Sequence, residues 1–155
     1  MTQKMIALSA AVGVLASIDP DAYSAGTYTS GWVDMANWQE VMAVVSVGTM
    51  ASGSTVDAKI EQATDASGTG AKDVTGALIT QLTEAGTDSD KQAVISMWAE
   101  DLDADNDFTH ARLSITVASA ASDAGGIVLG ASPRFGPVAD HDAASVSEIV
   151  IVDVN

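Results

Sequence analysis

The chain has 155 residues, of which 21 are acidic and 6 are basic, so that its formal net charge is −15. This length suits one domain built around one core, and we expect residues 1–155 to form a single domain. The negative charge repels phosphate backbones and anionic lipid headgroups, so nucleic acid and membrane surfaces are poor partners. The absence of cysteine excludes disulfides, zinc–thiolate sites and thiol nucleophiles.

The first apolar segment is Met5–Ile18, directly after Lys4. It superficially resembles a signal peptide, but it ends in Ser17-Ile18-Asp19-Pro20 without a small-x-small cleavage site. It is also too short to span a bilayer as a helix. We predict a strand or a pair of short strands here, with a buried helix as the alternative.

The next segments lie between residues 33 and 63. Residues Val33–Val41 are compatible with a helical turn. Residues Trp38–Met50 begin with polar side chains and become an apolar run, which is typical of a strand buried on both faces. In Thr55–Ala63 apolar and charged residues alternate, with Val56, Ala58, Ile60 and Gln62 on one side, so we predict a strand with one solvated face.

Turn-forming residues dominate the middle of the chain. Residues Thr64–Gly76 are rich in Gly, Ser, Thr and Asp and predict a long loop or an extended edge. Residues Thr75–Thr83 are compatible with a second helical turn. Residues Ala85–Asp90 form a turn cluster in front of the next apolar run.

Two strong strand candidates follow, Lys91–Glu100 and Phe108–Ala118, joined by the acidic segment Asp101–Asp107. In the second candidate the apolar side chains alternate with polar ones, which is the strand period. The residues expected on its buried side are Ala111, Leu113, Ile115 and Val117.

A turn is expected at Asp123–Gly126, followed by strands at Gly126–Ser132 and Val146–Val154. Since strand-length apolar runs recur with turn residues between them, the sequence predicts about eight or nine strands. The fold class is therefore all-β: a single-domain β-sandwich, jelly-roll-like, with long loops and at most short helical turns.

The segment Asp101–Asp107 invites comparison with a calcium loop, because carboxylates stand at alternating positions. The bidentate Glu expected at the twelfth place is replaced by Arg112, and the glycine expected at the sixth place by Asn106. A solvated acidic hairpin loop is the reading we favour over a calcium site.

No catalytic motif emerges from the remaining residues. His110 and His141 are the two histidines, and no Gly-x-Ser-x-Gly elbow accompanies them. His110 falls on the polar side of its strand, which favours a surface or interface role. The segment Gly68-Thr69-Gly70 lacks the third glycine and the helix of a phosphate-binding loop. Aromatic residues are too few for a sugar-binding cleft, and we expect no catalytic residue, cofactor or metal.

Four residues are candidates for contacts with other proteins. Trp32 and Trp38 bracket a short segment and are the type of residue found at binding hot spots, although one or both can equally cap the core. Arg134 and Phe135 lie between two prolines in Ser132–Pro137. Because proline restricts the backbone, this segment is expected to present both side chains as a contact arm.

Seven segments together span most of residues 28–137: Gly31–Met35, Met50–Lys59, Thr64–Asp73, Ile79–Leu82, Asp90–Gln92, Phe108–Leu113 and Pro133–Phe135. In the arrangement of these segments, the sequence resembles the small head decoration, or cement, proteins of tailed phages.

This resemblance implies a rigid β-sandwich made in the host cytoplasm, which docks on the outer surface of the phage head. Its partner would be the major capsid protein, and neighbouring copies of the chain are a further candidate. Such a protein stabilises the head against internal DNA pressure, and many copies on one shell give avidity.

Two rival hypotheses remain open. One is another phage structural role, such as a tail-tube, tail-terminator or head-completion protein. The other is a secreted calcium- or carbohydrate-binding β-sandwich module. The hypothesis that the protein is an enzyme is the one that the residues favour least.

Overall fold

The computed structural model describes residues 6–138 and 141–152. Its elements are almost all strands, with short 3₁₀ turns at Leu8–Ala10 (η1), Ala99–Asp101 (η2) and Ala104–Asn106 (η3). The strands are β1 (Gly13–Tyr23), β2 (Gly26–Thr29), β3 (Val33–Asp34), β4 (Trp38–Met50), β5 (Thr55–Ala63), β6 (Lys72–Leu78), β7 (Leu82–Thr83), β8 (Gln92–Trp98), β9 (His110–Ala118) and β10 (Ser122–Pro133).

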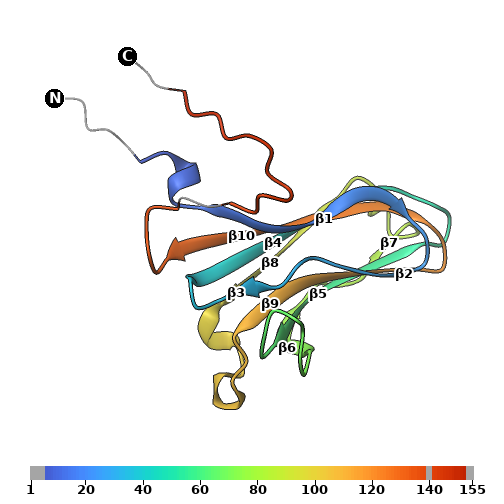
Figure 1. Ribbon diagram of the computed structural model, residues 1–155. Coiled ribbons are helices and arrows are strands. Elements are labelled where there is room, and N and C mark those ends of the chain that lie inside the picture. The colour runs from blue at the N-terminus through green and yellow to red at the C-terminus, as the bar shows by residue number, and fades with distance from the viewer. Residues whose placement is uncertain (1–5, 139–140, 153–155) are drawn as a thin grey trace.

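The strands form two antiparallel sheets that face each other (Figure 1). The first sheet has the order β1-β10-β4-β8, and the second has the order β2-β9-β5-β6, with β3 also paired to β9 and β7 to β5. The chain is therefore an all-β sandwich, as the sequence predicted.

The pairing follows the jelly-roll pattern. We take β2 with β3, and β6 with β7, each as one interrupted strand. The first strand of the described chain, β1, then pairs with the last, β10; inside this pair lie β2/β3 with β9, β4 with β8, and β5 with β6/β7. The contacts β10 to β4 and β9 to β5 then join these pairs into the two sheets. The chain thus behaves as one long hairpin rolled up on itself.

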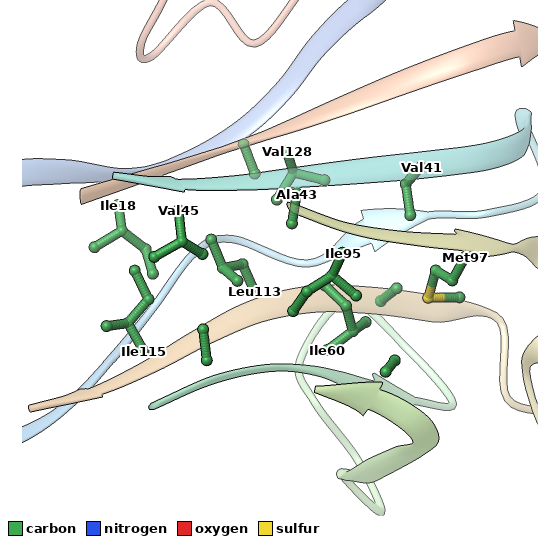
Figure 2. Close-up of a cluster of buried hydrophobic side chains, with 14 of the residues drawn as sticks. Ile18, Val41, Ala43, Val45, Ile60, Ile95, Met97, Leu113, Ile115 and Val128 are labelled. Atoms are coloured by element: carbon green, nitrogen blue, oxygen red, sulfur yellow. The ribbon is translucent and has the colours of Figure 1, made fainter. Parts of the chain in front are cut away.

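The core lies between the sheets and consists mainly of aliphatic side chains. Figure 2 shows Val41, Ala43, Val45 and Val128 of the first sheet pointing toward Leu113, Ile115 and Ile60 of the second. Such residues alternate with outward ones along each strand, because successive side chains in a strand point to opposite faces. Leu113 and Ile115 of β9 are fully buried at the centre.

The predicted bounds of β4 and β5 match the observed strands, and β8 and β9 lie within their predicted ranges. The prediction that Trp38–Met50 is buried on both faces is wrong, because only alternate residues of β4 are buried. A two-layer sandwich leaves each sheet with one outer face. In the described chain, nothing completely covers the outer face of the sheet that contains β4.

Several other predictions need correction. Residues Val33–Val41 and Thr75–Thr83 contain strand segments instead of helical turns. Pairing with β9 in the first range, and with β5 in the second, holds the backbone extended. The turn expected at Asp123–Gly126 belongs to β10, which pairs on both sides there. Of the two alternatives predicted for Thr64–Gly76, a long loop or an extended edge, the loop holds up to Ala71 and the edge from Lys72, where the edge strand β6 begins.

The two ends of the chain also differ from expectation. The predicted strand Met5–Ile18 is a 3₁₀ turn at Leu8–Ala10 followed by β1; Met5 itself lies outside the described residues. The predicted strand Val146–Val154 forms no strand up to Val152, and residues 153 and 154 lie outside the described part. The C-terminal segment instead passes outside the β1/β10 layer (Figure 1).

Candidate interaction surfaces

Trp32 lies against the second sheet and is half-buried. The guanidinium of Arg112 stands over its ring, 4.4 Å from the centroid, and also bonds Glu61 with an Nη2–Oε2 distance of 2.7 Å. Gly68, at a φ of 83°, approaches the same ring so closely that an added Cβ would lie 2.8 Å from Nε1. Trp32 is therefore held in place by neighbours on two sides, and its role as an interface residue stays a prediction.

Trp38 is a core residue in this fold, the alternative that the sequence left open. Its side chain is buried, and its ring packs against two glycines on neighbouring strands, Gly13 of β1 and Gly130 of β10. Since the ring fills the end of the sandwich, it offers no surface for a partner.

Arg134 and Phe135 lie in the loop that follows β10. The Arg134 N–H donates to the Asn37 carbonyl at 2.9 Å, which fixes the start of the loop. The Phe135 side chain is 77% exposed. Arg134 is exposed as well, and its guanidinium makes no ion pair with any residue in the described ranges. Both residues are therefore accessible to solvent, and their role as a contact arm stays a prediction.

The acidic segment after β8 is held together by its own hydrogen bonds. Asp101 accepts the Trp98 N–H at 2.8 Å, and Asp103 is bonded by Lys72 and by Asn106. The bonds from Lys72 and then Asn106 lower the pKa of Asp103 below its ordinary value. Among residues 6–138 and 141–152, no group of three or more His, Cys, Asp or Glu side chains is placed to hold a metal ion.

A second charged cluster lies on the outer side of β5 and β6. Lys59 donates to Asp73 at 2.6 Å and lies 3.4 Å from Glu61. The bond to Asp73 raises the pKa of Lys59 above its ordinary value, although partial burial opposes the effect. These exposed pairs contribute little to stability and leave few free positive charges on this sheet.

Both histidines make hydrogen bonds within the fold. His110 Nδ1 is 2.9 Å from the hydroxyl of its neighbour Thr109. His141 Nδ1 accepts the Val14 N–H at 3.0 Å, so its Nε2 carries the proton and donates to the Ser9 carbonyl, also at 3.0 Å. His141 thus fastens the C-terminal segment to the free edge of β1.

The structure reveals a surface that the sequence analysis missed, the outer side of the first sheet. Val94, Ile127 and Met42 point outward here and are 56%, 45% and 37% exposed. The register places Ile127 beside Val44 and Val44 beside Val94, so an apolar row crosses three strands. We call Met42, Val44, Val94, Trp98, Ile127 and Leu129 the outer apolar face.

Trp98 stands at the end of this face on β8 and is half-exposed. The alternation of its strand could have found it: Ile95 and Met97 are buried, so Val94, Ser96 and Trp98 must point outward. Its exposure and its place beside Glu40 of β4 make it a better interface candidate than Trp38.

A groove adjoins the outer apolar face beside an irregularity in the pairing of β1 with β10, between Ile18 and Asp21. Val44 and Ile127 line it, together with the Asp19-Pro20-Asp21 segment and Ala144 of the C-terminal segment. Its lining contains no aromatic side chain, which is the feature that a sugar ring would need.

No protein-family model matches the chain. No curated protein matches it either. One chain in the structure of the Gx strain of infectious bursal disease virus is similar, with a TM-score of 0.45 and 14% sequence identity over 81% of this chain. The similarity covers 33% of that chain, and at this TM-score it carries no functional conclusion.

No helix in the described ranges has the length and apolar character needed to cross a membrane.

Proposed function

We propose that the protein is a viral structural protein, a decoration protein that binds the outer surface of a phage capsid lattice and stabilises the head. The observation that carries the proposal is the outer apolar face. Large contiguous apolar patches on soluble proteins commonly mark sites that bind another molecule. The jelly-roll fold, frequent in viral capsid domains, supports the assignment by analogy only.

The geometry of this face suits docking on another protein. It is carried by β10, β4 and β8, which hydrogen bonds hold in fixed register. Because the strands are already ordered, binding costs little conformational entropy. Trp98 at the rim of the face supplies a large, rigid anchor, and the loop with Arg134 and Phe135 adds a second contact site.

The charge supports the same role. A net charge of −15 keeps unassembled copies apart and away from the packaged genome. It also makes docking sensitive to salt, provided that the capsid offers basic patches.

We also propose that the protein is not an enzyme. Both histidines are engaged in the hydrogen bonds described above, and within the described residues neither is bonded to the side chains of a Ser and an Asp in a triad. A decoration role needs no reactive side chain.

The direct experiment mixes the purified protein with capsids that have been stripped of their decoration protein. Imaging is expected to show density at regular lattice positions. Random or absent occupancy, or a ring that forms without any capsid binding, would reject the decoration role and favour a tail or head-completion role.

Variants locate the docking surface. Trp98→Ala should weaken capsid binding about 10-fold or more, as expected for a hot-spot residue, and Arg134→Glu should weaken it as well. Leu78→Ala is the control, because Leu78 is also a large, exposed apolar residue but lies on β6 of the other sheet. If Trp98→Ala binds like the wild type, the outer apolar face is not the docking surface.

A further inference from the structure

We infer that the C-terminal arm, Ser147–Val152, adds as a strand to the free edge of β8 in a second copy of this chain. The inference stands apart from capsid docking, because it concerns contacts between copies in solution. Three observations support it: the arm is unpaired, the edge of β8 is open, and the chain between Asp142 and the arm is short.

The arm has the composition of a strand but has no partner. Its residues are Ser-Glu-Ile-Val-Ile-Val, and the four apolar side chains are between 47% and 82% exposed. None of the six forms a backbone hydrogen bond with another described residue. β-branched apolar residues are strand formers, and an exposed run of them is the kind of segment that pairs with an available sheet edge.

The edge of β8 is open along most of its length. The Val47 N–H donates to the Lys91 carbonyl at 2.9 Å, so in this antiparallel pair Ala93, Ile95 and Met97 also turn their backbone groups toward β4. Gln92, Val94 and Ser96 therefore turn theirs outward. At Trp98 the outward N–H is already taken by Asp101, which marks the end of the available edge.

The other sheet edges carry protection that β8 lacks. On β1, the N–H and C=O of Val14 already bond His141 and Asp142, and Pro20 stands between two aspartates. In the second sheet, the edge strands β3 and β7 have only two residues each. The edge strand β6 is as long as β8, but it begins with the charged pair Lys72-Asp73, contains Gly76 at a φ of 83° and pairs irregularly with β5. β8 has seven residues without charge or proline, and an edge of this kind is a template for pairing.

The arm cannot lie along β8 of its own chain over its full length. Asp142 is bonded at the outer edge of β1, and a turn from Asp142 to Ser145 follows. A strand added to β8 would lie about five strand spacings away, or about 24 Å. Ser147, the first residue of the arm, is five residues from Asp142, and even a fully extended chain of that length spans only about 17 Å. Because the turn shortens the path further, at most the last few residues of the arm reach β8, and these are too few to form a strand along it. Pairing of the whole arm with this edge therefore requires another copy.

Such contacts are head-to-tail, because each copy offers an arm at one place and an edge at another. They generate closed rings, or open chains where the rotation does not close. The net charge opposes the contact at low salt, so association should strengthen as salt screens the repulsion.

The test measures the mass of the full-length chain by sedimentation as protein and salt concentrations rise. The wild type should shift to multiples of the monomer mass. Val150→Pro, which disrupts pairing of the arm, and Ser96→Pro, which places proline at an outward N–H of β8, should each remain monomeric. Ala143→Pro is the matched control, because proline is favoured at the second position of the turn Asp142–Ser145, and it should associate like the wild type.

Mixing the two monomeric variants distinguishes this mechanism from a general loss of association. Ser96→Pro retains an intact arm, and Val150→Pro retains an intact edge, so an equimolar mixture should form a two-copy species and nothing larger. Circular dichroism establishes that each variant is folded; if Ser96→Pro is not, Ser96→Lys replaces it as the edge-blocking variant. A wild type that stays monomeric throughout, association that survives Val150→Pro, or a mixture that stays monomeric would each overturn the inference.

Discussion

At the scale of single residues, glycines determine how closely the strands of the first sheet meet the core. An added Cβ at Gly130 would lie 2.6 Å from the Trp38 ring and 2.5 Å from Leu15 Cδ1. The rigid indole cannot move aside as a flexible chain can. Close packing at this end of the sandwich therefore depends on the missing side chain.

We expect Gly130→Ala to lower the free energy of unfolding by about 1–3 kcal/mol, the usual cost of overpacking a core. Gly31→Ala is the control, since no heavy atom lies within 4 Å of its added Cβ and its φ is outside the left-handed region. Its effect should stay within about 0.5 kcal/mol. Urea denaturation measures both, and equal stability of the two variants would contradict the packing argument.

Among the secondary-structure elements, one buried polar side chain ties a strand to two neighbouring segments. Gln62 of β5 donates from Nε2 to the Asp73 carbonyl of β6 at 3.3 Å, and its Oε1 accepts the Asp103 N–H at 2.8 Å. The sequence placed Gln62 on the apolar side of its strand, and the structure shows it buried there. It links β5, β6 and the acidic segment before β9.

Replacing this side chain should destabilise the fold although the new residue is apolar. Gln62→Leu leaves the Asp103 N–H and the Asp73 carbonyl without their partner, at a cost of about 1–3 kcal/mol. The Asp103 amide should also exchange its hydrogen faster. Gln39→Leu, an exposed glutamine on β4, is the control and should change stability by less than about 0.5 kcal/mol. Unchanged exchange at Asp103 in Gln62→Leu would show that the link does not order this segment.

The elements that sequence predicted well are those with a strong internal pattern. β5 alternates residue by residue, and β4 is a long apolar run that turn residues follow. β3 and β7 could not be predicted, because two-residue strands exist only through their partners β9 and β5. The C-terminal arm shows the converse: its residues favour a strand, but a strand needs a neighbour, and in the described ranges the arm pairs with none.

The candidate surface was predicted only in part for a related reason. Phe135 and Arg134 were identified because prolines mark the loop that exposes them. The outer apolar face was missed because an apolar run in one strand does not reveal how many of its faces are covered. Two sheets without a covering helix leave an outer face on each sheet. The expected sandwich therefore already implied that one side of each strand would be exposed.

At the scale of the whole molecule, the distribution of charge matters more than any single ion pair. Lys59, Lys72 and Arg112 are engaged with carboxylates on or beside the second sheet. Most of the 21 acidic residues therefore have no basic partner in the described structure. Mutual repulsion among them destabilises the compact state, and salt weakens that repulsion.

Raising the ionic strength with NaCl should therefore raise Tm, by about 2–4 °C for each kcal/mol of repulsion removed in a chain of this size. Asp105→Lys, which places a positive charge among the exposed carboxylates of the segment after β8, should raise Tm at low salt and reduce its dependence on salt. Calorimetry at matched ionic strength with NaCl and CaCl2 completes the measurement. If screening alone acts, the two salts give the same Tm; a further rise in CaCl2 that Asp103→Ala removes would instead identify a calcium site and favour the secreted-module hypothesis.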